Sequence, residues 1–450
     1  MDNTIVIHLE KNIRLKKTRI KMRAYITLLG LLAAFSLSAQ QHKKILLLDG
    51  FLHVGNGEIM ERSAILIEDG IITDVRNSLA YSYQESDWDT IIHLNGKQIY
   101  PGFVAPNTTL GLTEIDAVRA TRDFDEVGLY NPHVRSQIAF NVESNVISTI
   151  RTNGVLLGQP TPRGGRISGT SSIMRFNGWN WEDATIKASD GIHVNWPSSL
   201  QGGGWWAEPK PKERNKNYSS ELEDLYAFFD LSKAYTEGNR EETDIRLEGM
   251  NSTFNGDANI YFHANELQQL LDIIDFVKHY QFKHAVIIGG YDSYLITEQL
   301  RDSKIAVMLP RVHSLPEKED DPVDLPYRLP ALLQKGNVKF CLQNAGDMEA
   351  MNTRNIPFLA GTARSYGLST EEAIRAVSLS ACEILGIEKQ YGSVEKGKSA
   401  TLFVSEGDAL DMRTNQLNLA IIDGDFVPLE NMQTDLYYKY TTKYKRQGKQ

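Results

Sequence analysis

Residues 100–111 read YPGFVAPNTTLG, and the spacing of apolar residues along the chain changes at this stretch. Before it, from Ile45 to Ile99, short β-rich runs alternate with Asp-Gly and Asn-Gly pairs, which favour tight hairpin turns. After it, apolar side chains recur at helical spacing over residues 267–277, and apolar runs at 285–288 and 305–309 are typical of buried strands. Alternating strands and helices predict a parallel sheet with right-handed crossovers.

The C-terminal part of the chain contains short β-rich runs like those of the N-terminal part. Runs at 400–404 and 419–422 precede the pair Asp423-Gly424, so we expect both ends of the chain to build one small β-domain. Between them, Ser369 and Glu372 fit a capping box that opens the last helix of the central region, which should stop near Gly386.

The first 39 residues are not expected to belong to the folded unit. A basic stretch is followed by an apolar run from Ala24 to Leu37, which is the pattern of a secretory signal peptide. Met22 is an alternative start that would give a leader of more usual length. A membrane anchor is the competing interpretation, but the run is shorter than the ~20 residues that a bilayer requires. We therefore expect an exported protein, periplasmic or secreted, with no membrane span after leader removal.

Charge and cysteine content exclude some classes of protein. The chain carries a net charge of −9, and the expected leader is basic, so the remainder is still more acidic. Such a surface argues against nucleic acid as a partner. The two cysteines, Cys341 and Cys382, are too few for a disulfide framework. Both lie among apolar residues, which favours buried free thiols and leaves a single bridge as the alternative.

Four stretches together carry a resemblance to a known family. Residues 100–111 resemble the first barrel strand of the amidohydrolase superfamily, imidazolonepropionase-like branch, where the pattern is Pro-Gly-Phe-(Val/Ile)-Asp-x-His-x-His. Residues 260–265 look like the fifth strand and 338–346 like the eighth. The run GSVEKGKSA at 392–400 resembles the return of that family into its small β-domain.

The resemblance implies an α/β fold, a (β/α)8 TIM-type barrel with a small composite β-sandwich domain formed by the N- and C-terminal segments. Its active site would lie at the carboxyl ends of the strands, where one or two divalent metals activate water to attack a C–N bond. The expected organisation is a signal peptide over 1–39, the N-terminal part of the β-domain over 40–100, the barrel over 101–388, the C-terminal part of the β-domain over 389–430 and a tail over 431–450.

Most of the metal ligands that the resemblance implies are replaced in this sequence. The two strand-one histidine positions hold Asn107 and Thr109, whose neutral oxygens are weak donors for a transition metal. The strand-six position falls at Gly289, which has no side chain, and the strand-eight aspartate position falls at Gln343 and Asn344. We find no lysine that could be the strand-four ligand.

Two residues remain as candidates for chemistry. His263 matches the strand-five ligand and is a candidate metal contact, with a hydrogen-bonded structural histidine as the alternative. Asp347 follows the strand-eight position by a few residues and is a weak candidate for the catalytic base. An exposed loop aspartate is the simpler explanation.

Other segments are candidates for ligand contacts. Arg163 and Arg166 lie in a glycine-containing loop that could hold an anionic group near the pocket, or could form a tight turn with solvated arginines. Trp179 and Trp181 belong to an aromatic stretch, expected to be a long loop, that could stack on a ligand or cover the barrel mouth. Lysines and tyrosines alternate near the C-terminus, where they could contact an acidic partner or form a solvated tail.

These observations favour an exported amidohydrolase-like protein with lost or much reduced hydrolase activity. It would bind a small-molecule ligand or support a homologous active subunit, with an oligomer as one option, and no cofactor is expected. The alternative is an active hydrolase that cleaves peptide or non-peptide C–N bonds through an unconventional metal site, with zinc as the metal, built around His263. A third interpretation is a purely structural interaction module.

Overall fold

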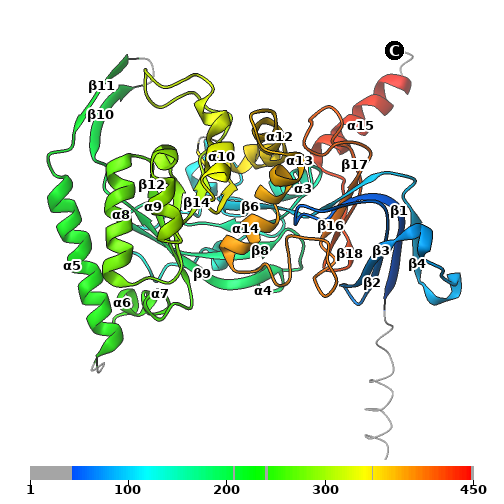
Figure 1. The fold of residues 1–450 in the computed structure, drawn as a ribbon, viewed down its shortest axis with the longest axis horizontal. Helices are drawn as coiled ribbons and strands as arrows, with labels where there is room; N and C mark the ends of the chain where they lie inside the picture. Colours follow the sequence, from blue (N-terminus) through cyan, green and yellow to red (C-terminus); the bar gives the residue numbers. More distant parts are fainter. Residues whose placement is uncertain (1–42, 206–207, 239–241, 347, 447–450) are drawn as a thin grey trace, which may run out of the picture. The chain divides into compact units, whose positions relative to one another are not determined.

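A composite sheet is built from both ends of the chain, as the sequence predicts. The computed structural model describes residues 43–205, 208–238, 242–346 and 348–446. The sheet has eight strands in the order β18-β17-β16-β5-β1-β2-β3, with β4 paired to β1. Figure 1 shows its blue N-terminal strands beside its orange and red C-terminal ones. Its strands are β1 Lys44–His53, β2 Ile59–Glu68, β3 Ile71–Asn77, β4 Thr90–His93, β5 Gln98–Pro101, β16 Leu402–Ser405, β17 Leu417–Ile422 and β18 Asp425–Phe426.

Strand β5 leads from this sheet into the barrel. It pairs antiparallel with β16, so that Ile99 lies opposite Val404, and the chain then enters β6 after Gly102. The eight barrel strands follow the order β6-β7-β8-β9-β12-β13-β14-β15. They are β6 Phe103–Thr108, β7 Val155–Pro160, β8 Ile167–Arg175, β9 Thr185–Asn195, β12 Asn259–Ala264, β13 Ala285–Gly289, β14 Ala306–Leu309 and β15 Phe340–Leu342.

One barrel strand departs from the predicted parallel alternation. Strand β8 runs antiparallel to both β7 and β9. The connection between β7 and β8 spans only residues 161–166, and a parallel crossover needs a dozen or more residues. The prediction of a long loop around the tryptophans is also wrong in part. Much of that segment forms β8, β9 and an antiparallel hairpin of β10 Leu200–Trp205 and β11 Glu208–Arg214.

Helices cover the outside of the barrel. On one side, Phe229 of α5 and Phe276 of α8 pack edge to face on each other, and Phe276 also packs against Phe262 of β12. The predicted capping box is present, because the Ser369 hydroxyl and the Glu372 carboxylate each accept from the other's backbone N–H. The helices that the argument uses are α3 Asn145–Arg151, α5 Tyr218–Glu237, α8 Leu267–Tyr280, α9 Thr297–Asp302, α10 Leu325–Lys335, α12 Ile356–Ser365, α13 Thr370–Ala376, α14 Leu379–Leu385 and α15 Met432–Arg446.

The barrel interior is closed at the amino ends of its strands by α14. Cys382 and Leu385 of this helix pack with inward residues such as Val104 and Met308. Asn259 and Lys187, at the same end of the barrel, donate to the backbone carbonyls of Ile384 and Leu385. The helix ends at Gly386, which has the left-handed conformation that the sequence predicts for a helix stop. Helix α14 therefore covers the apolar interior at this end of the barrel.

Two further features test the sequence interpretation. Cys341 and Cys382 are both buried free thiols. The lysine- and tyrosine-rich segment near the C-terminus forms α15, a helix with no buried residue (Figure 1). None of the helices in the described ranges has the length and apolar character that a membrane crossing requires.

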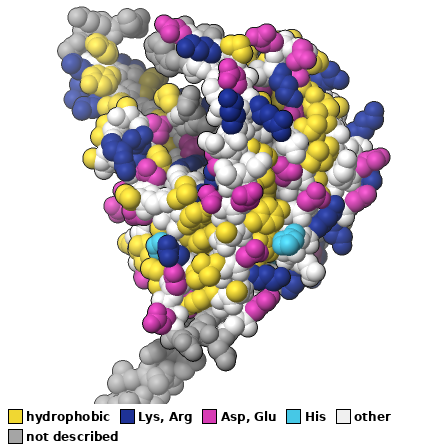
Figure 2. All heavy atoms as spheres, turned by 90° about the vertical axis from the view of Figure 1, so that its left-hand side faces the viewer, with side chains coloured by type: hydrophobic (Ala, Val, Ile, Leu, Met, Phe, Trp, Pro, Cys, Tyr) yellow, Lys and Arg dark blue, Asp and Glu magenta, His cyan; other side chains and the backbone are white. Residues whose placement is uncertain are grey.

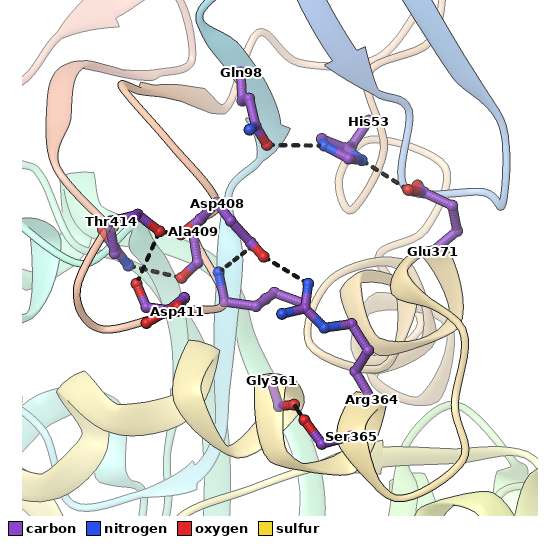
Figure 3. A network of polar contacts seen from close by, with 12 residues as sticks. His53, Gln98, Gly361, Arg364, Ser365, Glu371, Asp408, Ala409, Asp411 and Thr414 are labelled. Carbon is purple, nitrogen blue, oxygen red and sulfur yellow. Dashed lines mark hydrogen bonds and ion pairs between the residues drawn. The ribbon is translucent and has the colours of Figure 1, made fainter.

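Polar contacts join the composite sheet to the barrel helices (Figure 3). The buried imidazole of His53, at the end of β1, lies with Nδ1 2.7 Å from the Glu371 carboxylate on α13 and Nε2 3.2 Å from the side-chain oxygen of Gln98. Nearby, Arg364 of α12 pairs with Asp408 at 2.6 Å. These contacts fix the sheet against the last helices of the barrel.

We expect His53→Ala to lower the free energy of unfolding by about 1–3 kcal/mol, because it leaves a largely buried carboxylate without its hydrogen-bond donor. Urea unfolding measures this loss. Arg62→Ala is the control, since the Arg62–Asp49 pair is exposed and such pairs contribute about 0–1 kcal/mol. Equal losses in the two variants would contradict this role for His53.

Candidate functional site

A pocket of about 480 Å³ opens at the carboxyl ends of the barrel strands. We call it the mouth pocket. Asn107 of β6, His263 of β12, Gly289 of β13 and Gln343 just after β15 all line it. The structure therefore brings together, at one end of the barrel, positions that the sequence assigned to the altered metal site.

Asn107 lies at the centre of the contacts on one side of this pocket. It is buried and has a left-handed backbone with φ 49°, a conformation that asparagine tolerates better than most residues. The Arg163 guanidinium donates to the Asn107 side-chain oxygen at 2.9 Å and to its backbone oxygen at 3.0 Å. Arg163 also pairs with Glu349 at 3.0 Å. The Arg163 guanidinium thus contacts Asn107, which occupies a position where the family has a metal-binding histidine.

His263 is paired with a second histidine that the sequence interpretation missed. Its Nε2 lies 3.0 Å from Nδ1 of His193, which is fully buried on β9. Burial, followed by the charge of Arg163, lowers the pKa of His263 to about 3. Burial lowers the pKa of His193 well below its usual value, and the charges of His263 and Arg163 act in the same direction. Both rings are therefore neutral at pH 7, and one donates a hydrogen bond to the other.

The remaining altered positions offer poor metal donors. At Gly289, φ is 101° and an added Cβ would lie 2.4 Å from the Asn265 side-chain oxygen, so the site has no room for a ligand side chain. The Gln343 side-chain oxygen accepts from the backbone N–H of Ala345 at 2.6 Å. Thr109 and Asn344 are buried, and the Thr109 hydroxyl and the Asn344 amide nitrogen have no hydrogen-bond partner among the described residues.

A polar chain runs from the mouth pocket into the barrel, and its members were not predicted. The side-chain oxygen of Gln159 accepts from the Asn107 backbone N–H at 2.9 Å, and its amide nitrogen donates to Asp190 at 2.7 Å. Asp190 is fully buried, where it pairs with Lys187 at 3.1 Å and accepts from Tyr261 at 2.6 Å. Polar residues inside otherwise apolar strands were the sequence feature that could have indicated this chain.

Other predicted contacts lie elsewhere. Arg166 donates to the Asn195 carbonyl and pairs with Glu221, so it joins β9 to α5. Trp179 is almost fully exposed and Trp181 packs against the main core. Both lie between β8 and β9 at the end of the barrel opposite the mouth pocket, because β8 runs antiparallel. Asp347 lies outside the described residues.

The described donors do not fit the metal centre that the resemblance implies. No group of three His, Cys, Asp or Glu side chains in the described ranges could hold a metal ion. His193 and His263 are two donors, whereas catalytic zinc sites use three protein ligands. The nearby Arg163 cation would in addition repel a metal ion.

Comparison with known proteins supports the resemblance. Residues 238–432 match the model of the Amidohydrolase family. The resemblance to amidohydrolases is confirmed. The match includes the β12, β13 and β15 positions discussed above, but it begins after β6. No curated protein matches the sequence.

Solved amidohydrolase structures share the fold of this chain. An amidohydrolase from Thermotoga maritima MSB8 superposes with a TM-score of 0.73 at 23% identity, over 86% of this chain and 100% of that one. A Xaa-Pro dipeptidase with bound methionine gives 0.52 at 13% identity, over 86% and 100%. The A. niger ochratoxinase gives 0.52 at 12% identity, over 86% and 96%. These low identities establish the amidohydrolase fold alone.

The neutral histidine pair predicts a loss of stability in acid. An unfolded histidine has a pKa near 6.5, so below that pH the unfolded chain binds protons that the folded pair does not. Stability due to His263 should be complete above about pH 6.5 and should fall as the pH decreases, by about 2 kcal/mol at pH 5. Urea unfolding at pH 7.5 and 5 should show a smaller difference for His263→Gln than for the wild type.

The exposed His284 supplies the matched control, because His284→Gln should keep the pH dependence of the wild type. An unchanged pH dependence in His263→Gln would contradict the neutral buried pair.

Proposed function

We propose that this chain is an exported, catalytically depleted amidohydrolase-like protein that binds a small polar molecule in its mouth pocket without a metal ion. The proposal depends on one observation above all. Arg163, through two hydrogen bonds to Asn107, places a guanidinium where the family has metal ligands.

Unpartnered polar atoms around the mouth support ligand binding. Four buried atoms near the carboxyl ends of β6, β9, β12 and β15 have no hydrogen-bond partner among the described residues. An unpartnered buried polar group costs about 1–3 kcal/mol, so such groups normally contact water or a ligand. The atoms are Thr109 Oγ1, His193 Nε2, Asn265 Oδ1 and Asn344 Nδ2.

The rim of the pocket indicates what kind of molecule would fit. Lys212 and Arg311 line it together with Glu266 and Glu317, so charges of both signs surround the opening. Amide groups of Asn107, Asn265 and Gln343 line the pocket as well, and amides both donate and accept. A volume of about 480 Å³ is within the range of small-molecule sites. We infer a polar or zwitterionic ligand of metabolite size.

A second candidate function is favoured by the histidine pair. Two imidazole nitrogens 3.0 Å apart, at His193 and His263, could become ligands of one metal ion if a further donor approached. In that case the protein would be a hydrolase of C–N bonds with an unconventional zinc site. The two functions differ in metal content, which can be measured directly.

We expect purified protein, incubated with zinc and then passed through gel filtration, to hold far less than one zinc per chain by elemental analysis. His263→Ala should give the same near-zero value, and neither protein should hydrolyse simple dipeptides. One tightly held zinc in the wild type that disappears in both His263→Ala and His193→Ala would instead establish the second candidate.

We also expect a crystal structure of protein purified without denaturation to show electron density for a small molecule in the mouth pocket. The molecule should lie within hydrogen-bond distance of at least two of the lining amide groups of Asn107, Asn265 and Gln343. Ligand binding would be contradicted if the crystals show only ordered water in the pocket and mass spectrometry of extracts from the protein detects no bound small molecule. A structural role, or a supporting role to an active subunit, would then remain.

Export is proposed from the sequence of residues 1–39, which lie outside the described part of the chain. The basic stretch and the apolar run to Leu37 are the support for it. Cell fractionation combined with N-terminal sequencing tests the proposal. A cytoplasmic product that retains Arg23 would contradict it.

A further inference from the structure

A second cavity, of about 380 Å³, lies at the amino ends of the barrel strands, opposite the mouth pocket. Its lining comes from the starts of β12, β13 and β14, the segment before β15, and the helices α9 and α14. Val286, Ala306 and Ile384 form an apolar part of the lining, and the nearly buried Asn259 contributes an amide. We call it the basal pocket. Nothing in the proposed function uses it.

Basic residues precede three consecutive strands at this rim. Lys283 and His284 come just before β13, Lys304 comes two residues before β14, and Lys339 directly precedes β15. The strands are parallel neighbours, with Val286 opposite Ala306 and Val307 opposite Phe340. Because the amino ends of parallel strands meet at one rim, these side chains converge on one opening.

The charges around the basal pocket are strongly unbalanced. Lys283, Arg301, Lys304 and Lys339 line it, and Glu383 is the acidic residue of the lining. Glu383 is shared by Lys339 at 3.1 Å and by Arg375 at 2.6 Å, so it cannot neutralise the other cations. On the face drawn in Figure 2, basic and acidic side chains are interspersed. The chain as a whole has a net charge of −9, which makes this basic rim a local exception.

Lys304 is the most informative of these cations. Its ammonium group has no ion-pair or hydrogen-bond partner in the described part of the chain, whereas the Lys283 ammonium donates to the Asn255 carbonyl and Arg301 contacts Asp302. Lys304 also has a left-handed backbone with φ 56° directly after α9, where helices usually end in glycine or asparagine. The Lys304 side chain is exposed at this position.

We propose that the basal pocket is a binding site for a small anion that carries two or more negative charges, with phosphate or carboxylate groups. Lysine ammonium groups act as point charges for such groups, and they converge here from three strands without an equal number of acidic partners. Asn259 also lines the pocket, but its amide nitrogen already donates to Tyr261 and to the Ile384 carbonyl. The site is separate from the mouth pocket, so the inference does not depend on the proposed function.

Isothermal titration of the full-length protein with inorganic pyrophosphate, and separately with citrate, tests the proposal at constant ionic strength in chloride buffer. The wild type should bind at least one of the two saturably, with one site per chain. Lys304→Ala and Arg301→Ala should each weaken that binding by about tenfold, as expected for loss of one charge-assisted contact. Both residues are exposed, so circular dichroism should show intact folding.

Lys278→Ala is the matched control, because Lys278 is an exposed lysine of α8 that lines neither the basal pocket nor the mouth pocket. This variant should bind pyrophosphate or citrate as the wild type does. The inference is overturned if neither anion binds the wild type saturably, if Lys304→Ala and Arg301→Ala bind as tightly as the wild type, or if Lys278→Ala loses binding to the same extent.

Discussion

The hydrogen bonds between the Arg163 guanidinium and both oxygens of Asn107 are the contacts around which the barrel mouth is organised. They hold Asn107 in its left-handed conformation, and they place a positive charge beside His263 and His193. That charge, together with burial, keeps both imidazoles neutral. Glu349 pairs with the same arginine and also accepts from the Gly346 backbone N–H at 3.0 Å, so the loop after β15 is fixed by the same cation.

Polar side chains continue from the mouth into the interior of the barrel. Gln159, Asp190 and Tyr261 continue the chain of hydrogen bonds from Asn107, and Lys187 neutralises the buried carboxylate. Removing one partner from such a network is costly, because the others are then left unsatisfied in a low-dielectric environment. Asn259, which lines the basal pocket, donates to Tyr261 at 2.7 Å, so the network extends from the mouth to the opposite end of the barrel.

Much of the fold could be predicted from the sequence, because it depends on local patterns. The pair Asp69-Gly70 joins β2 and β3 in an antiparallel hairpin, as expected. The pair Asp49-Gly50 instead lies inside β1, and β4 and β5, on either side of Asn95-Gly96, both pair parallel with β1. The capping box at Ser369 and the left-handed Gly386 are present, but the single helix expected between them is two helices, α13 and α14. The antiparallel β8 was missed, since strand periodicity carries no direction and only the short 161–166 connection reveals it. At the site, the sequence indicated the altered positions Asn107 and Gly289. It could not indicate that Arg163 and His193 would meet them, because those contacts join residues far apart in the chain.

The two cysteines show what burial does to reactivity. Burial raises the pKa of both thiols far above the usual range, and Cys341 and Cys382 are each completely shielded from solvent. Attack on a foreign disulfide or an oxidant requires the thiolate and access to it, and neither is present. The folded protein should therefore tolerate an oxidising compartment without forming mixed disulfides, although its unfolded chain would not be protected in this way.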